Sequence, residues 1–360
     1  MANQNIRTPR FYTDMINYLM ARGVAQNGEF DVIATGGVFQ GLQTGTEAEL
    51  FDMKPLNKVD FDTSANTTDH VLITIDTQTA NFHINYVAIL NHNLVTSVGK
   101  IRIFAGDIAS DVASVDGSAC ETADIDWSEV TVTEIVNADT ITAGADDKSV
   151  VIEPATNGST IVTFPDETVR YWGIQFEGNT TNTGNATDGT WGSTDLHLGG
   201  IMIGEYYDMP RSPDMSVKRS IMFDQTKIQE SVGGQRYSNM TSWGPQSNDD
   251  THSPFNISSR AYTSYGGRMT YDFSFSYLAS SDVMPSEYAS VQYGSDTAVE
   301  DVWNITHGNH IPFIFSIDND SKGNNAESEH VFARFAQNSL DMNQVANDVW
   351  NISMRIEEEF

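Results

Sequence analysis

The feature that most constrains this chain is a stretch in its second half whose side chains alternate strictly between apolar and polar. The apolar set is Met269, Tyr271, Phe273, Phe275 and Tyr277, and polar residues occupy every position between them. This two-residue period is typical of a β-strand with one buried and one solvated face. The stretch from Val349 to Glu358 repeats the pattern, so we expect a sheet of antiparallel strands in this half.

Short apolar, strand-like segments also fill the first half, where helical periodicity is almost absent. Clusters of Gly, Asp, Asn and Thr separate them, as turns require. This spacing predicts an antiparallel β-sandwich. The segments are 71–76, 86–90, 101–104, 130–132, 150–152, 161–164, 171–176 and 196–203, with a further one at 311–317 and a polar surface loop expected at 178–190.

One short helix is expected near the N-terminus. Thr8 suits the cap, Pro9 suits the first helical position, and Gly23 is a plausible stop. Phe11, Met15, Tyr18 and Leu19 would share one face. A helix this short is marginal in water, so it must dock on its own domain or on a neighbouring subunit, and Phe11 and Tyr18 become candidate interface residues.

The length of 360 residues favours more than one domain. Pro210 and Pro213 interrupt regular structure, and we place a boundary just before them. The prediction is an all-β protein with an N-terminal helical arm (1–30), a jelly-roll β-sandwich (31–206) and a second antiparallel β-barrel or sandwich (207–360).

Charge and composition narrow the function classes. The formal net charge is −30, with 49 acidic and 19 basic residues, which disfavours binding to nucleic acid. A salt-rich environment explains such acidity equally well. The single cysteine, Cys120, allows neither an intrachain disulfide nor a cysteine zinc site. We see no leader and no apolar run long enough for a membrane span, so a soluble protein made in a cytoplasm is expected.

Residues that could carry chemistry are few. Asp318, Asn319 and Asp320 are the preferred calcium candidates because they offer oxygen ligands, although solvated loops explain acidic clusters more often and no EF-hand spacing occurs. His92, between Asn91 and Asn93, is a candidate base, but a polar turn is the favoured interpretation. No carboxylate pair or nucleophile motif can be nominated, so we expect no enzyme, with calcium as the one possible cofactor.

Tryptophans provide a candidate glycan platform. Trp172 belongs in the core because it lies within an alternating strand. Trp191 adjoins the polar loop and is the better candidate for exposure, with an interface role preferred to sugar binding. Trp127 and Trp243 are weaker candidates.

Several segments resemble known families. Residues 85–94, running into an Asn-His-Asn-Leu turn, together with 170–176 and 197–204, resemble discoidin-like (galactose-binding-like) jelly rolls attached to tailed-phage tail proteins. In the second half, 231–234, 267–273 and 312–315 are similar to distal-tail-like β domains at the tail tip.

The resemblance implies a structural protein of a phage virion, assembled in the host cytoplasm. It would lie in the tail tip or baseplate, form a homo-oligomeric ring of sixfold or threefold symmetry, and dock other virion proteins. Alternatives are a module that binds host-surface glycans, a capsid or neck decoration protein, and a wall-degrading enzyme.

Overall fold

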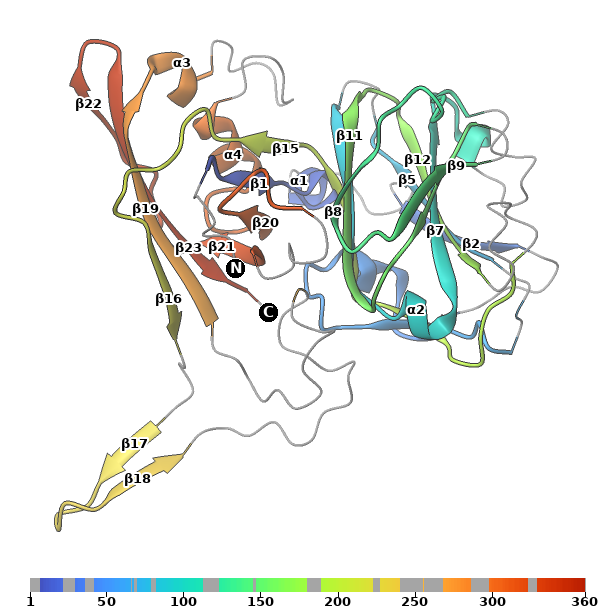
Figure 1. Ribbon diagram of the computed structural model, residues 1–360, viewed down its shortest axis with the longest axis horizontal. Coiled ribbons are helices and arrows are strands. Elements are labelled where there is room, and N and C mark those ends of the chain that lie inside the picture. Colours follow the sequence, from blue (N-terminus) through green and yellow to red (C-terminus); the bar gives the residue numbers. More distant parts are fainter. Residues whose placement is uncertain are drawn as a thin grey trace.

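The all-β prediction is confirmed by the computed structural model. Among the residues that it describes, strands account for 48% and helices for 12% (Figure 1). The described ranges are 7–21, 30–35, 42–65, 67, 70–78, 82–112, 123–144, 147–179, 189–222, 227–239, 255, 268–285, 298–322 and 329–359.

Two antiparallel sheets in the first half face one another as a β-sandwich. The larger has the order β2 (Phe30–Thr35), β5 (His70–Asp76), β12 (Tyr171–Gly178), β7 (Gly99–Gly106), β10 (Val150–Glu153) and β9 (Thr140–Ala143). The smaller has the order β14 (Gly200–Gly204), β6 (Ile84–His92), β11 (Gly158–Glu167) and β8 (Thr133–Val136). The strand expected at 130–132 is wrong, because the strand at this place, β8, spans Thr133–Val136.

The apolar side chains on the inward faces of the strands fill the sandwich core. Trp172, Ile174 and Phe176 of β12 point inward with residues of β5 and β7, and residues of β6, β11 and β14 meet them. The core placement of Trp172 is confirmed. A small sheet of β13 (Leu196–Leu198), β4 (Val59–Phe61) and β3 (Leu42–Thr44) joins this lobe, with short helices η1 (Glu47–Phe51), α2 (Leu94–Ser97) and η2 (Ala109–Val112).

A buried ionic group lies on the other face of the larger sheet, because its residues alternate with the inward-facing ones. Glu177 is fully buried and accepts hydrogen bonds from Arg102, with nitrogen to oxygen distances of 3.1 and 3.3 Å. The Lys100 Nζ atom lies 3.4 Å from Glu177 Oε1, and Gln175 Nε2 donates to the same carboxylate at 2.8 Å. One carboxylate therefore serves two cations on the neighbouring strand β7.

The second half forms an eight-stranded sheet. Its order is β15 (Tyr206–Asp208), β1 (Arg10–Tyr12), β20 (Phe313–Ser316), β21 (His330–Phe335), β23 (Val349–Glu358), β19 (Arg268–Leu278) and β16 (Lys218–Met222), and β22 (Met342–Ala346) pairs with β23. The two alternating stretches become β19 and β23. Tyr271, Phe273 and Phe275 are buried, whereas Tyr277 is 74% exposed. Two helices, α3 (Ser280–Val283) and α4 (Val299–Ile305), border this core.

The N-terminal helix begins later than the sequence predicts. Residues 10–12 form β1, which pairs with β15 on one side and β20 on the other. The helix α1 spans Met15–Ala21, and the Asp14 carboxylate accepts the Asn17 backbone N–H at its start. Pairing with two distant strands outweighs the local cap and proline signals at Thr8 and Pro9. The expected stop at Gly23 lies outside the described residues.

The C-terminal strand is not an edge. β23 lies between β19 and the strands β21 and β22, so Glu357 and Glu358 at its end do not lie on an unpaired edge. Glu357 pairs with Arg268, Glu359 pairs with Arg334, and Glu358 accepts the Met269 backbone N–H. Local ion pairs and hydrogen bonds account for them.

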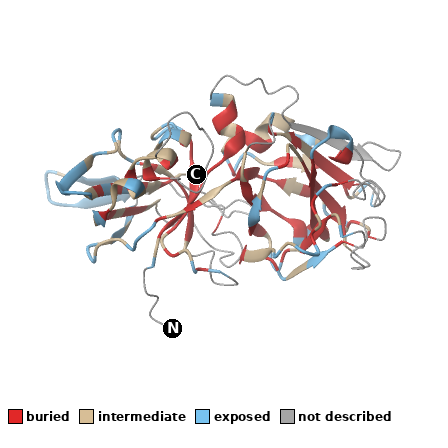
Figure 2. Cartoon of the chain, turned by 90° about the horizontal axis from the view of Figure 1, so that it is seen from above, coloured by how far each residue is buried: buried red, intermediate tan, exposed pale blue. Residues whose placement is uncertain are grey.

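A third apolar cluster joins the two halves. Successive residues of β6 alternate between two cores: Val87 and Ile89 face the sandwich, whereas Tyr86, Ala88 and Leu90 face the second sheet. There they meet Tyr12, Ile314 and Phe332. The four-stranded sheet is therefore covered on both faces, and Figure 2 shows the buried strands continuing through the middle of the molecule. The division at 30 and 206 stays a prediction, and β1 belongs to the second sheet.

Candidate interaction surfaces

Phe11, a predicted interface residue, lies in the core of the second half. Its ring is 1% exposed and lies 5.2 to 5.9 Å from the rings of Phe313, Phe315 and Phe335, measured between centroids. The side chain packs within its own chain and offers no surface to a partner.

Tyr18 is also covered by its own chain. It is 4% exposed and stacks on His307 at a centroid distance of 5.8 Å. Of the two options for the N-terminal helix, docking on its own domain is what the structure shows, because α1 packs on β14 and contributes Met15, Ile16 and Leu19 to the sandwich core.

Trp191 is buried, so its predicted exposure is wrong. The indole is 3% exposed and packs over the backbone of Gly99, where an added Cβ would lie 2.4 Å from the ring. The polar residues beside Trp191 in the sequence did not predict this burial, because the ring packs near Gly99 and Leu94, which are distant in the sequence. Trp127 and Trp172 are buried as well, and Trp243 lies outside the described residues. The three candidates that the structure describes therefore form no exposed sugar platform.

The Asp318–Asp320 segment is a turn held by protein partners. Asp318 is 5% exposed and accepts the Asp320 backbone N–H at 3.0 Å. Arg7 pairs with Asp320 at 2.5 Å, and the Asn319 N–H donates to the carbonyl of Thr8. Among the described residues, no group of three or more acidic, histidine or cysteine side chains is arranged to hold a metal. Calcium binding at this turn stays a prediction.

His92 has the turn role that the sequence favoured. The imidazole is 1% exposed, its Nε2 lies 2.8 Å from Thr160 Oγ1, and its Nδ1 accepts the Leu94 N–H. Burial, with a smaller contribution from His197, lowers the pKa of His92 from 6.5 to about 3. The flanking Asn91 and Asn93 side chains donate to the carbonyls of Pro55 and Asp195.

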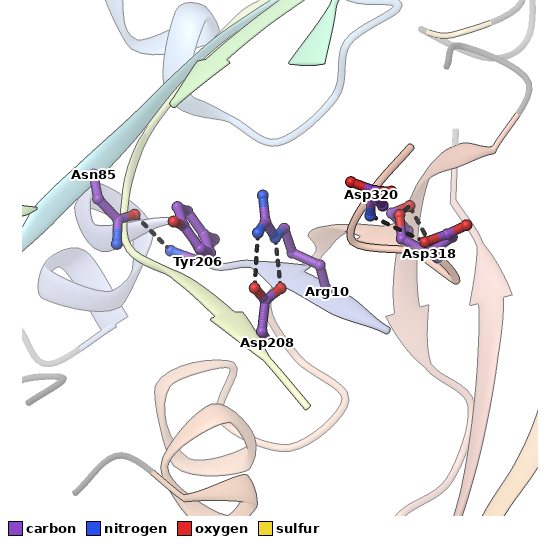
Figure 3. A network of polar contacts seen from close by, with 7 residues as sticks. Arg10, Asn85, Tyr206, Asp208, Asp318 and Asp320 are labelled. Atoms are coloured by element: carbon purple, nitrogen blue, oxygen red, sulfur yellow. Dashed lines mark hydrogen bonds and ion pairs between the residues drawn. The ribbon is translucent and has the colours of Figure 1, made fainter. Parts of the chain in front are cut away.

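At the junction between the two halves, an ion pair within the second sheet lies near a hydrogen bond from β6 of the sandwich (Figure 3). Arg10 donates two hydrogen bonds to the Asp208 carboxylate, at 2.6 and 2.7 Å, and its guanidinium lies 3.9 Å from the Tyr206 ring centroid. Asn85 accepts the Tyr206 backbone N–H and donates to Asp166. A forked arginine–carboxylate pair of this kind holds β1 and β15 in register.

A small pocket opens at the same junction. It encloses about 300 Å³ including its mouth, and its walls include Met15, Phe82, His83, Glu205 and Ile305. Burial, and then the nearby charges of Asp166 and Asp301, raise the pKa of Glu205 from 4.5 to about 9. The carboxyl is therefore protonated at neutral pH, which suits a mostly apolar pocket.

Stability is expected to depend on pH through Glu205. Because the folded-state pKa lies above the unfolded value, the folded protein holds an extra proton between about pH 4.5 and pH 9, and stability falls as the pH rises through that window. Glu205→Gln is expected to raise the melting temperature relative to the wild type at about pH 8.5 and to leave it unchanged at about pH 4.5. Thermal unfolding of both proteins at the two pH values measures this. An equal shift at both would contradict it.

The main exposed apolar surface lies on a segment for which the sequence suggested no surface role. We call residues 215–239 the arm; its described part contains β16 and the hairpin of β17 (Lys227–Glu230) and β18 (Arg236–Asn239). Figure 1 shows the hairpin projecting from the body. The arm holds six of the eleven large apolar side chains that are exposed in the described part of the chain: Met215, Ile221, Met222, Ile228, Val232 and Tyr237.

The arm also differs from the body in charge. It contains four basic residues and two acidic ones, a net charge of +2, so the remaining residues carry −32 of the total of −30. The basic residues are Lys218, Arg219, Lys227 and Arg236, and all four are exposed. This concentration of cations is the one sequence signal from which the arm could have been found.

Fold and surface together define a two-lobed β protein that presents a projecting, apolar and basic hairpin. No family model, no curated protein and no solved structure matches this chain. Within the described ranges, no helix has both the length and the apolar composition needed to cross a membrane.

Proposed function

We propose that this chain is a structural protein of a tailed-bacteriophage virion, placed in the tail tip or baseplate, where it forms a homo-oligomeric ring and docks other virion proteins. Its function is to bind, not to catalyse.

The observation that carries this proposal is the exposed arm. Six large apolar side chains open to solvent within 25 residues are a liability in a protein that acts alone, whereas they are expected in a protein that assembles. The rest of the described chain buries its large apolar side chains well. Even the four-stranded sheet, which has two apolar faces, has both of them covered.

The placement in a tail rests on the resemblance of short segments. Two of these segments are neighbours in space, because β6 carries the Asn-His-Asn-Leu turn and pairs with β14 at 200–204. A third, 170–176, supplies most of β12 in the facing sheet. Segments that share one fold unit support a common origin more strongly than scattered ones do.

Electron cryomicroscopy of intact particles tests the proposal. Tracing this chain into the density gives its copy number, neighbours and symmetry. A ring at the tail tip or baseplate supports the proposal. A position on the capsid or neck contradicts the location, and absence from the particle contradicts the structural role.

A further inference from the structure

We propose that the arm of one copy docks on the acidic edge of the sandwich of a second copy. This inference rests on the proposed homo-oligomeric function and names the surfaces that form the contact. The acidic edge is defined as residues 124–153, which contain β8, β9 and β10.

The hairpin has an exposed apolar side chain on each of its two faces. Cross-strand partners in an antiparallel hairpin share a face, and the register pairs Ile228 with Ser238 and Gln229 with Tyr237. Side chains two residues apart also share a face, so Ile228 and Arg236 lie on one face and Lys227 and Tyr237 on the other. Each face thus presents one exposed apolar residue and one cation, and on the face of Ile228 the cation Arg236 is paired with Glu230 at 3.2 Å.

The strand that precedes the hairpin has the same character. β16 is the last strand of its sheet and pairs only with β19 in the sheet order. Ile221 is 57% exposed and its neighbour Met222 is 42% exposed, although consecutive strand residues point to opposite faces. Both faces of β16 therefore expose an apolar side chain at this end.

The acidic edge is opposite to the arm in charge and includes two strand edges. Residues 124–153 contain eight acidic residues and a single basic one, Lys148, for a net charge of −7. Asp124, Glu129, Asp139 and Asp147 are exposed. β8 and β9 are the last strands of their two sheets, so this side of the sandwich offers two strand edges to which an incoming strand can add.

The contact must form between copies. Figure 1 shows the hairpin projecting below β16 at the lower left and β9 at the upper right, in the opposite lobe. A cationic, apolar hairpin that cannot reach the acidic edge of its own chain can reach that of a neighbour. Repetition of such a head-to-tail contact closes a ring when the rotation permits it.

Charge reversal on the full-length chain tests the proposal. Sedimentation velocity of the wild type at low salt (about 0.05 M) and high salt (about 0.5 M) is expected to show oligomers that weaken as salt rises. Lys227→Glu with Arg236→Glu is expected to raise the dissociation constant by about tenfold or more. Glu129→Lys with Asp139→Lys is expected to do the same, and combining all four substitutions is expected to restore association.

Two further variants test whether association depends on the position of the charges and on the apolar side chains of the hairpin. Lys54→Glu with Lys322→Glu makes the same change in net charge at exposed sites outside the arm, and it is expected to leave association unchanged. Ile228→Ser with Tyr237→Ser removes apolar surface from the hairpin and is expected to weaken association at both salt concentrations. Circular dichroism of each variant confirms that the fold is intact.

The outcomes separate this inference from the proposed function. Oligomers that persist with the arm charges reversed overturn the arm contact and leave a homo-oligomer in place. Failure of the fourfold variant to reassociate overturns the pairing of arm and acidic edge. A wild type that stays monomeric at low salt overturns the contact between copies, and the position of the chain in particles then decides the proposed function independently.

Discussion

Glu177→Ala is expected to destabilise the protein by about 3–5 kcal/mol, the largest effect that we predict for a single substitution. Glu177 is fully buried between Lys100 and Arg102, which are themselves 0% and 2% exposed. Removing its carboxylate leaves two cations in the sandwich without the anion that offsets their desolvation. The cost comes from the charges left behind, so it exceeds the small contribution of a solvated ion pair.

Chemical denaturation of Glu177→Ala, with the wild type alongside, measures this effect. The matched control is Glu230→Ala, which breaks the pair with Arg236 on the hairpin, where the two side chains are 54% and 76% exposed. This control is expected to change stability by less than about 1 kcal/mol. Similar losses for the two variants would show that the buried carboxylate does not hold the sandwich together.

Phe11→Ala is expected to cost about 3–5 kcal/mol. The ring contacts three other phenylalanines in the second sheet, and its removal leaves a cavity among side chains that are themselves fixed in strands. The substitution also tests the corrected start of the chain. A residue on a docked helical arm would be removed at a smaller cost than a residue in an interior strand.

The control for Phe11→Ala is Tyr277→Ala, on β19 of the same sheet. Tyr277 is 74% exposed, so its truncation is expected to change stability by no more than about 0.5 kcal/mol. Thermal and denaturant unfolding of both variants measure the difference. A mild effect at Phe11 would place β1 outside the cooperative core.

The alternation of apolar and polar residues predicted strands best where it continues over many positions. β19 and β23 carry long alternations, and the inward residues Phe273, Phe275 and Ile356 are buried as the period requires. The prediction weakens at strand ends, where Tyr277 keeps the alternation but extends beyond the core. Periodicity identifies a face and does not show how far the facing layer reaches.

The start of the chain could not be predicted from its own residues. Thr8 and Pro9 are good helix-start signals, yet residues 10–12 become a strand because β15 and β20, about 200 and about 300 positions away, pair with them. Burial of Trp191 is similar, since its cover comes from Gly99 and Leu94 and not from its neighbours in the chain. Both outcomes depend on contacts that no sequence window contains.

In the arm, the sequence failed to predict exposure, whereas at Phe11 and Trp191 it failed to predict burial. Its strands have ordinary composition, and Ile228 and Tyr237 read as core residues in a hairpin. Only the structure shows that both side chains are exposed. Exposure of an apolar residue is a property of the whole fold, so candidate surfaces are the part of function that sequence patterns predict least well.

The position of β1 has a consequence for how the protein is made. Its two neighbours in the sheet are β15 and β20, so β1 leaves the ribosome long before residues 313–316, its second partner, have been made. The sandwich strands 70–204 can pair earlier, while the second sheet closes only after residues 313–316 have emerged. Such long-range closure slows folding and leaves Phe11 and Tyr12 open to wrong contacts meanwhile. A nascent chain that stops before residue 313 would therefore carry a folded sandwich, while β1 would lack its β20 partner and be prone to aggregation.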